Sequence, residues 1–130
     1  MGQLLPAVHV LLVDDSPKLR EALSVVLEGE GAVVTAAGTA EHALDLLQRL
    51  RPDVLLSDLE MPDKDGLWLI GQVRALTPER GGNTPAACLT GFTEPEIRAT
   101  LLRAGFQYHI AKPVKLETLV GVVGLLALKP

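Results

Sequence analysis

Charged and hydroxyl side chains follow four of the five short apolar runs in this sequence of 130 residues. Asp14 and Asp15 follow the first run, Asp58 follows the third, and the last two end in Thr90 and Lys112. Three carboxylates repel one another unless a cation shares them, and an all-oxygen site of this kind suits Mg²⁺ or Mn²⁺. A nearby ammonium and hydroxyl would bind a tetrahedral anion. The set therefore predicts phosphoryl transfer onto Asp58.

The elements that must position these residues are predicted from the alternation of apolar runs with segments of helical periodicity. This alternation is typical of repeated strand–helix units around a parallel sheet. The expected strands are 8–13, 33–36, 54–57, 86–89 and 108–111. Right-handed crossovers favour the strand order 2-1-3-4-5, in which the first and third strands are neighbours. The predicted fold class is α/β, a flavodoxin-like doubly wound parallel sheet with five helices, and its aspartates should meet beyond the carboxyl ends of the strands.

Capping residues and apolar stripes predict where the helices lie. Ser16 is the expected N-cap of the first helix, and Gly29 is its expected end. Thr39 caps the second helix, and its buried stripe leaves His42 on the solvated side; that stripe is Ala40, Ala43, Leu44 and Leu47. The predicted apolar stripes are Leu19, Ala22, Leu23, Val26 and Leu27 in the first helix, and Ile97, Thr100, Leu101 and Ala104 in the fourth.

The composition indicates one compact globular domain over residues 1–130, with a core of about 7–128. A net charge of −4 leaves no basic face for nucleic-acid phosphates, so we expect no direct DNA binding. The only cysteine, Cys88, lies in an apolar run and fits a buried thiol in a reducing cytosol. We expect no membrane association, because no signal peptide is evident and no apolar run reaches about 18 residues.

Four motifs follow the strands in order. They are Val13-Asp14-Asp15-Ser16-Pro17, Asp58-Leu59-Glu60-Met61-Pro62-Asp63-Lys64-Asp65-Gly66, Leu89-Thr90-Gly91 and Ala111-Lys112-Pro113-Val114. With these motifs the chain closely resembles, over nearly its whole length, the receiver (phosphoacceptor) domain of bacterial two-component response regulators. The resemblance implies a cytoplasmic signalling protein that accepts a phosphoryl group from phosphohistidine. The donor would be a histidine kinase or a histidine phosphotransfer protein.

The resemblance also implies a role for each site residue. Asp58 would be the phosphoacceptor, and Asp14 and Asp15 would hold Mg²⁺ with Asp58 and the backbone carbonyl of Glu60. Lys112 would bind the phosphoryl oxygens and precede a cis peptide bond, which a following proline permits. Such a domain would catalyse its own phosphorylation and dephosphorylation without being a turnover enzyme in the usual sense.

The switch residues depart from the commonest receiver pattern. Thr90 would be the switch hydroxyl, and its usual aromatic partner stands three residues before the lysine. That position is His109 here, with Tyr108 one step out of register. The segment around His109 looks most like receivers attached to hybrid histidine kinases, and the chain as a whole resembles these or single-domain regulators. We expect His109 to replace the aromatic residue in the switch.

The predicted fifth helix is apolar around its whole circumference, from Leu119 to Leu128, and it contains two glycines. A surface helix needs only one apolar stripe to pack on a sheet. This excess favours a partner on the outer side of the helix, in a homodimer or by interdomain docking. The alternative is a helix that is buried more deeply than usual.

Two other functions remain open at the level of the residues. A phosphatase of the haloacid dehalogenase type also uses a nucleophilic Asp, Mg²⁺, Thr and Lys. It requires a second Asp two residues after the nucleophile, whereas Asp58 is followed at that spacing by Glu60. A non-signalling flavodoxin-like binding module is the second alternative, but residues 13–19 contain no glycine-rich phosphate loop.

Overall fold

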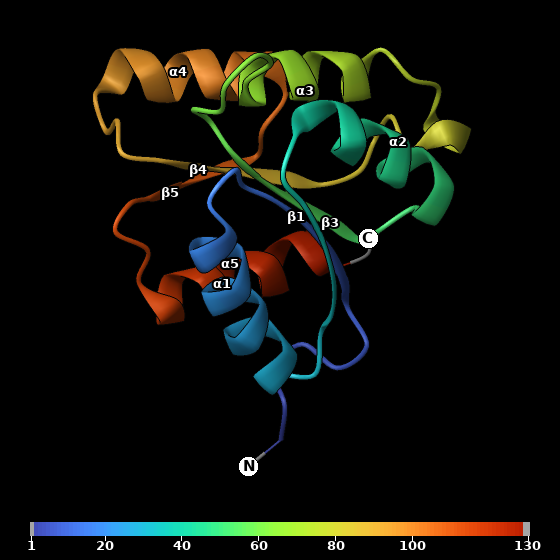
Figure 1. Ribbon diagram of the computed structural model, residues 1–130, viewed down its shortest axis with the longest axis vertical. Helices are drawn as coiled ribbons and strands as arrows, with labels where there is room; N and C mark the ends of the chain where they lie inside the picture. The colour runs from blue at the N-terminus through green and yellow to red at the C-terminus, as the bar shows by residue number, and fades with distance from the viewer. Residues whose placement is uncertain (1, 129–130) are drawn as a thin grey trace.

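The computed structural model describes residues 2–128 and contains one parallel sheet of five strands (Figure 1). The strand order is β2-β1-β3-β4-β5, as predicted. The strands are β1 His9–Val13, β2 Val33–Ala37, β3 Val54–Asp58, β4 Ala86–Thr90 and β5 Tyr108–Ala111. Each predicted strand is confirmed to within one residue at either end. The α/β class and the adjacency of β1 and β3 are therefore as the sequence indicated.

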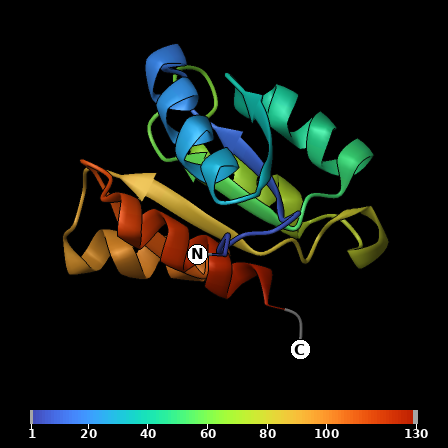
Figure 2. The same cartoon turned by 90° about the horizontal axis from the view of Figure 1, so that it is seen from below.

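Five α-helices cover the two faces of the sheet. They are α1 Pro17–Gly29, α2 Ala40–Leu50, α3 Gly66–Arg74, α4 Pro95–Ala104 and α5 Leu116–Ala127, with a short 3₁₀ helix at Pro78–Arg80. Helices α1 and α5 pack on one face, and α2, α3 and α4 pack on the other (Figures 1 and 2). This arrangement leaves the carboxyl ends of the strands free of covering helices.

The two central strands β3 and β4 are buried along their entire length. Strands covered by helices on both faces are usually continuous apolar runs, because neither face meets water. Three polar residues interrupt these runs, Ser57 and Asp58 in β3 and Thr90 in β4. Asp58 and Thr90 are the last residues of their strands, so the carboxyl edge is where the sheet departs from apolar packing.

Helix α1 begins as predicted, but two details of its packing differ. Ser16 Oγ accepts a hydrogen bond from the backbone N–H of Leu19 at 3.2 Å, which confirms the N-cap. Ala22 is exposed, so its place in the apolar stripe was wrong; at about 100° per residue it lies at the edge of the stripe. Gly29 is the last helical residue, but the left-handed turn follows at Gly31, whose φ is 95°.

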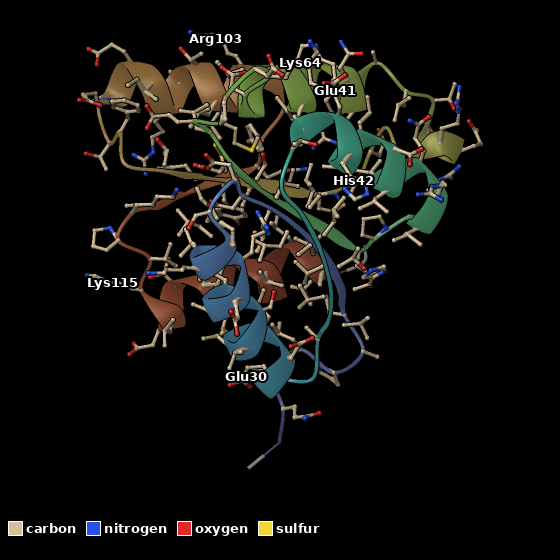
Figure 3. All side chains as sticks on the ribbon, in the orientation of Figure 1. Glu30, Glu41, His42, Lys64, Arg103 and Lys115 are labelled. Carbon is tan, nitrogen blue, oxygen red and sulfur yellow. The ribbon has the colours of Figure 1, made fainter. Side chains whose placement is uncertain are left out.

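Helix α4 is held loosely compared with the other helices on its face. Its only fully buried residue is Leu101, and Glu94 at its start provides no side-chain cap. Thr100 is exposed, contrary to the predicted stripe, because it lies at the margin of that stripe; its hydroxyl donates to the carbonyl of Glu96 at 2.9 Å, one turn earlier. On α2, by contrast, Thr39 caps the helix and His42 lies on the exposed side as expected (Figure 3).

Helix α5 buries one stripe, formed by Leu119, Val123 and Leu126, while Leu125 on the opposite side is 54% exposed. The segment before β1 contributes Leu5 to the core on this face, and the Leu5 side chain lies next to Gly124 of α5. Part of the unusual apolar character of α5 is therefore explained by this segment. None of the helices within residues 2–128 is long and apolar enough to cross a lipid bilayer.

Candidate functional site

The carboxyl edge of the sheet gathers the acidic residues that the sequence singled out. Asp14 follows β1 directly, and Asp58 ends β3, the strand paired with β1. One carboxylate oxygen from each of Asp14, Asp15 and Asp58 lies within 4.8 Å of the others. Asp14 and Asp58 are almost fully buried, with 1% and 4% exposure, whereas Asp15 is exposed. The predicted cluster of three aspartates therefore forms.

Lys112 brings the only basic group that pairs with this cluster among the described residues. Its Nζ donates to Asp58 Oδ1 at 2.9 Å and lies 3.5 Å from Asp14 Oδ2. The lysine follows β5, and its backbone N–H bonds to the carbonyl of Thr90 at 2.9 Å. The main chain thus fixes the ammonium beside the acids, which is the arrangement that an anion-binding site needs.

Burial and charge act in opposite directions on these groups. Burial raises the pKa of Asp58, and the hydrogen bond from Lys112 offsets only part of that effect. Burial by itself would lower the pKa of Lys112, but the hydrogen bond and charge of Asp58 outweigh it, so the pKa is raised. One ammonium therefore does not compensate the buried carboxylates in full.

The remaining deficit fits a divalent cation. Asp14 Oδ1 accepts a hydrogen bond from the backbone N–H of Ser16 at 2.9 Å. Asp14 Oδ2 is buried and accepts no hydrogen bond, and its ion pair with Lys112 Nζ is long, at 3.5 Å. A buried carboxylate oxygen without a hydrogen bond is costly unless a cation lies close to it. The donors are all oxygen, and exposed Asp15 leaves an opening for water, which is the environment that Mg²⁺ prefers. Glu60 lies beside the cluster, since its backbone hydrogen-bonds to Asp58.

Thr90 ends β4 next to the site and is 1% exposed. Its Oγ1 accepts a hydrogen bond from the backbone N–H of Phe92 at 3.0 Å, which ties the side chain to the loop before α4. A groove of about 520 Å³ lies alongside, with Glu60, Phe92 and Leu67 among its lining residues. Phe92 is 40% exposed at this groove. Any water or partner that approaches Asp58 from this side passes these side chains.

His109 is not part of the aspartate cluster. It is half-buried on β5 and pairs in register with Cys88 of β4, two residues before Thr90. It lines a separate hollow of about 400 Å³ with Arg98, Leu102 and Tyr108. The role of His109 as a switch residue stays a prediction, supported by its place on the strand next to Thr90.

Cys88 is buried, and burial raises the pKa of its thiol to about 12. The expectation of an inert packing thiol agrees with this environment. The predicted cis bond between Lys112 and Pro113 is also present.

Two residues at the site gave no clear signal in the sequence. Gly66 begins α3, and a Cβ there would lie 2.5 Å from the carbonyl oxygen of Asp58, so only glycine fits. The turn composition of 63–66 concealed this packing role. Arg20 donates from Nη1 to the backbone carbonyl of Asp14 at 2.6 Å. An arginine on a surface helix is usually solvated, and nothing in the spacing distinguished this one.

The chain shares this architecture with proteins of known family. A family model described as the response regulator receiver domain matches residues 10–124. The chain is 44% identical over 121 residues to a 14.6 kDa protein encoded in the sodA1 3′ region of Leptolyngbya boryana, with 93% of this chain and 91% of that protein covered. A putative response regulator from Chloroflexus aurantiacus has a solved structure that superposes with a TM-score of 0.86 at 30% identity, covering 93% of this chain and 98% of that one.

Several curated relatives are longer proteins. The DNA-binding response regulator MtrA of Mycolicibacterium smegmatis is 36% identical over 115 residues, which is 88% of this chain but 48% of MtrA. The chain thus spans about half the length of that regulator.

Proposed function

Because this chain belongs to the family of response regulator receiver domains of two-component signalling, we propose that it accepts a phosphoryl group on Asp58. The observation that carries the proposal is the buried Asp58 carboxylate, held 2.9 Å from Lys112 within a cluster of aspartates that one ammonium does not neutralise. Such a carboxylate is both positioned as a nucleophile and placed in a field that favours an added cation.

In the proposed reaction an oxygen of Asp58 attacks the phosphorus of a phosphohistidine. The P–N bond breaks, the imidazole leaves with its electron pair, and an acyl phosphate forms on Asp58. Lys112 pairs with the phosphoryl oxygens, and the Thr90 hydroxyl donates to one of them. Hydrolysis by water then breaks the P–O bond, which restores the carboxylate and releases inorganic phosphate. The chain acts on itself in both steps, so it is not a turnover enzyme in the usual sense.

Asp14, Asp15, Asp58 and the carbonyl of Glu60 are the groups that would hold Mg²⁺ or Mn²⁺. When bound, the ion would neutralise charge that develops on the phosphoryl oxygens. The lack of a hydrogen bond to Asp14 Oδ2 and the all-oxygen donor set support this assignment.

We expect the phosphoryl donor to be a histidine kinase or a histidine phosphotransfer protein in the cytoplasm of a bacterium. Phosphorylation would change the affinity of a surface for its partner. The exposed side of α5 is one such surface, for a homodimer or for docking between domains. Leu125→Glu tests it, because Leu125 is 54% exposed, whereas Leu126 is 6% exposed and its substitution would disturb the core. Loss of self-association in Leu125→Glu is the expected result for a homodimer, and an unchanged association state would exclude a homodimer through this surface.

The direct test of the proposed function is incubation with acetyl phosphate and Mg²⁺, followed by intact-protein mass spectrometry. We expect a stoichiometric adduct of one phosphate that hydroxylamine removes, no adduct in Asp58→Asn, and none when EDTA replaces Mg²⁺. Asp63→Asn is the matched control, because it makes the same chemical change on an exposed turn nearby and should leave the adduct unchanged.

The same experiment separates the alternatives. A phosphatase of the haloacid dehalogenase type would turn over p-nitrophenyl phosphate, and a simple binding module would form no adduct at all. A full phosphate adduct in Asp58→Asn would show that the acceptor is a different residue.

A further inference from the structure

Arg20 makes an unusual contact with the aspartate cluster. Its side chain is half-buried on α1, and Nη1 donates to the backbone carbonyl oxygen of Asp14 at 2.6 Å. Among residues 2–128, no carboxylate lies within ion-pair distance of this guanidinium. The arginine therefore bonds the main chain of a proposed metal ligand, and its charge is left without a direct partner.

Gly38, at the end of β2, provides the space in which the guanidinium lies. A Cβ at Gly38 would lie 3.0 Å from Nη1 and 3.5 Å from Cζ of Arg20. The backbone of Gly38 is not in the left-handed region, so conformation alone does not require glycine there. A Cβ at Gly38 would therefore press on the end of the Arg20 side chain, and the guanidinium would have to shift by a few tenths of an ångström.

The contact completes the hydrogen bonding of Asp14 except at one atom. The backbone N–H of Asp14 donates to the carbonyl of Ala37 at 3.1 Å, and Oδ1 accepts from the N–H of Ser16 at 2.9 Å. With Arg20 on the carbonyl, three polar groups of Asp14 are held by neighbours. Only Oδ2 has no hydrogen-bond partner, and it lies 3.5 Å from Lys112 Nζ in the cluster. The peptide is thus fixed in the orientation that presents Oδ2.

We infer that Arg20 is a positioning residue that increases the Mg²⁺ affinity of the aspartate cluster by fixing the Asp14 peptide, in the space that Gly38 leaves. This inference rests on the proposed function. A cation close to the site also repels Mg²⁺, so the two effects have opposite signs. The charge of a half-exposed guanidinium is screened by solvent and salt. Loss of a group that orients a metal ligand typically weakens metal affinity by about 10-fold or more. Positioning therefore outweighs repulsion.

The test is the Mg²⁺ dissociation constant of the full chain, measured by calorimetry without phosphate donor. We expect Arg20→Met and Gly38→Ala each to weaken binding about tenfold. Gly38→Ala keeps the arginine and its charge but displaces the guanidinium. Arg20→Lys should recover part of the affinity, because an ammonium can still donate to the carbonyl. Arg49→Met is the control for charge, since Arg49 is exposed and pairs with Asp45 far from the site, and it should change affinity less than twofold.

A second measurement needs no metal. Amide hydrogen exchange of Asp14 and Ser16 in the metal-free chain should be faster in Arg20→Met and Gly38→Ala, and unchanged in Arg49→Met. The double variant Arg20→Met/Gly38→Ala should be no weaker for Mg²⁺ than either single variant, because both remove the same contact.

The direction in which the Mg²⁺ dissociation constant changes tests the positioning role of Arg20. Equal or tighter Mg²⁺ binding by Arg20→Met would show that the arginine acts only through its charge, and would overturn it. Unchanged binding in Gly38→Ala would overturn the role given to the glycine. If the wild-type chain itself binds no Mg²⁺, the proposed function fails too, whereas wild-type binding with unaffected variants rejects the positioning role alone.

Discussion

Charged side chains are buried at both ends of the parallel strands, here called the amino edge and the carboxyl edge of the sheet. The two edges differ in how these charges are hydrogen-bonded. At the amino edge, Arg74 at the end of α3 lies between the loops that lead into β4 and β5. Its five N–H groups all donate, to the carbonyls of Gly82, Thr84 and Gly105 and to Gln107 Oε1, at 2.7 to 3.3 Å. At the carboxyl edge, three aspartates face one lysine, and Asp14 Oδ2 has no hydrogen-bond partner.

Burial shifts the pKa at both edges, lowering that of Arg74 and raising that of Asp58. A perturbed titration therefore does not distinguish a structural charge from a functional one. The two sites differ in how completely their polar atoms are hydrogen-bonded. Every N–H donor of Arg74 is already used, so the guanidinium has no donor left for a ligand. In the aspartate cluster, the buried Asp14 Oδ2 accepts no hydrogen bond, which leaves room for the proposed cation. A buried polar atom without a hydrogen bond therefore points to the proposed site better than buried charge does.

The largest effect that we predict is at the amino edge. Arg74→Met should lower the free energy of unfolding by about 3 kcal/mol, because it leaves several loop carbonyls without donors. The loss should be the same with and without Mg²⁺, since Arg74 is not part of the aspartate cluster proposed to bind the ion. Denaturant unfolding in both conditions measures it. Arg80→Met is the control, because exposed Arg80 makes one side-chain bond, to Gln48, and should cost less than about 0.5 kcal/mol.

If Arg74→Met lowers the free energy of unfolding no more than Arg80→Met does, the proposed difference between the two edges is contradicted. The hydrogen bonds of Arg74 would then contribute nothing measurable, and its burial would be incidental.

The next effect has the opposite sign. Burial raises the pKa of Asp58, so the folded chain keeps a proton that the unfolded chain has already released, and stability falls as the pH rises through that interval. At pH 7 the ionised carboxylate therefore destabilises the metal-free fold. Asp58→Asn should stabilise the metal-free chain at pH 7 by about 1 kcal/mol. The gain should shrink toward acidic pH and when Mg²⁺ binds the wild type.

Unfolding curves from pH 3 to pH 8, with Mg²⁺ or with EDTA, provide the measurement. Asp45→Asn removes an exposed carboxylate and should change stability by less than about 0.5 kcal/mol at any of these pH values. A metal-free Asp58→Asn that is less stable than the wild type at pH 7 would mean that the Lys112 pair outweighs burial.

The same contrast explains which parts of the molecule the sequence could predict. Strand positions and their order were predictable, because apolar runs and crossover handedness are local or topological rules. The residues Asp14, Asp58 and Lys112 were found because each stands at the end of a run. Arg74 and Arg20 were not found, because their partners are backbone carbonyls, which every residue has. No residue type in the sequence marks such an acceptor.

Some predictions of side-chain burial were wrong for a related reason. Helical periodicity predicts on which face of a helix a residue lies. How deeply the residue is buried depends on which side chains of the neighbouring element cover it. Ala22 and Thr100 lie at the margins of their stripes, and both are exposed. Gly66 is the reverse case, since its turn-like context concealed a close approach to Asp58 that only the folded chain contains.

A smaller effect concerns access to the open edge. Phe92 lines the groove beside Glu60, where it should hinder a water that approaches the phosphoryl group in line. Phe92→Ala should shorten the half-life of phospho-Asp58 about threefold, which corresponds to about 0.7 kcal/mol in the barrier. Decay of the adduct is followed by mass spectrometry after the donor is removed. Tyr108→Ala is the matched control, because Tyr108 is also 40% exposed but lies at another hollow. An unchanged or longer half-life in Phe92→Ala would contradict the shielding role.

The smallest effect tests whether the open edge communicates with the α4–β5 face. The Thr90 hydroxyl accepts a hydrogen bond from the loop before α4, at Phe92. Leu101 is the one fully buried residue of α4. We therefore expect the loop and α4 to yield easily when the Thr90 hydroxyl moves toward a bound phosphoryl group. His109 lies on the neighbouring strand, opposite the residue two before Thr90, and is half-buried at the edge of a hollow. We therefore expect beryllofluoride with Mg²⁺, a mimic of the phosphoryl group, to shift the imidazole resonances of His109 in NMR spectra. Those of His42 on the exposed side of α2 should not shift, since that helix has no bond to Thr90. A chain that binds beryllofluoride while His109 stays unchanged would confine the response to the site itself, and the output surface would then have to lie elsewhere.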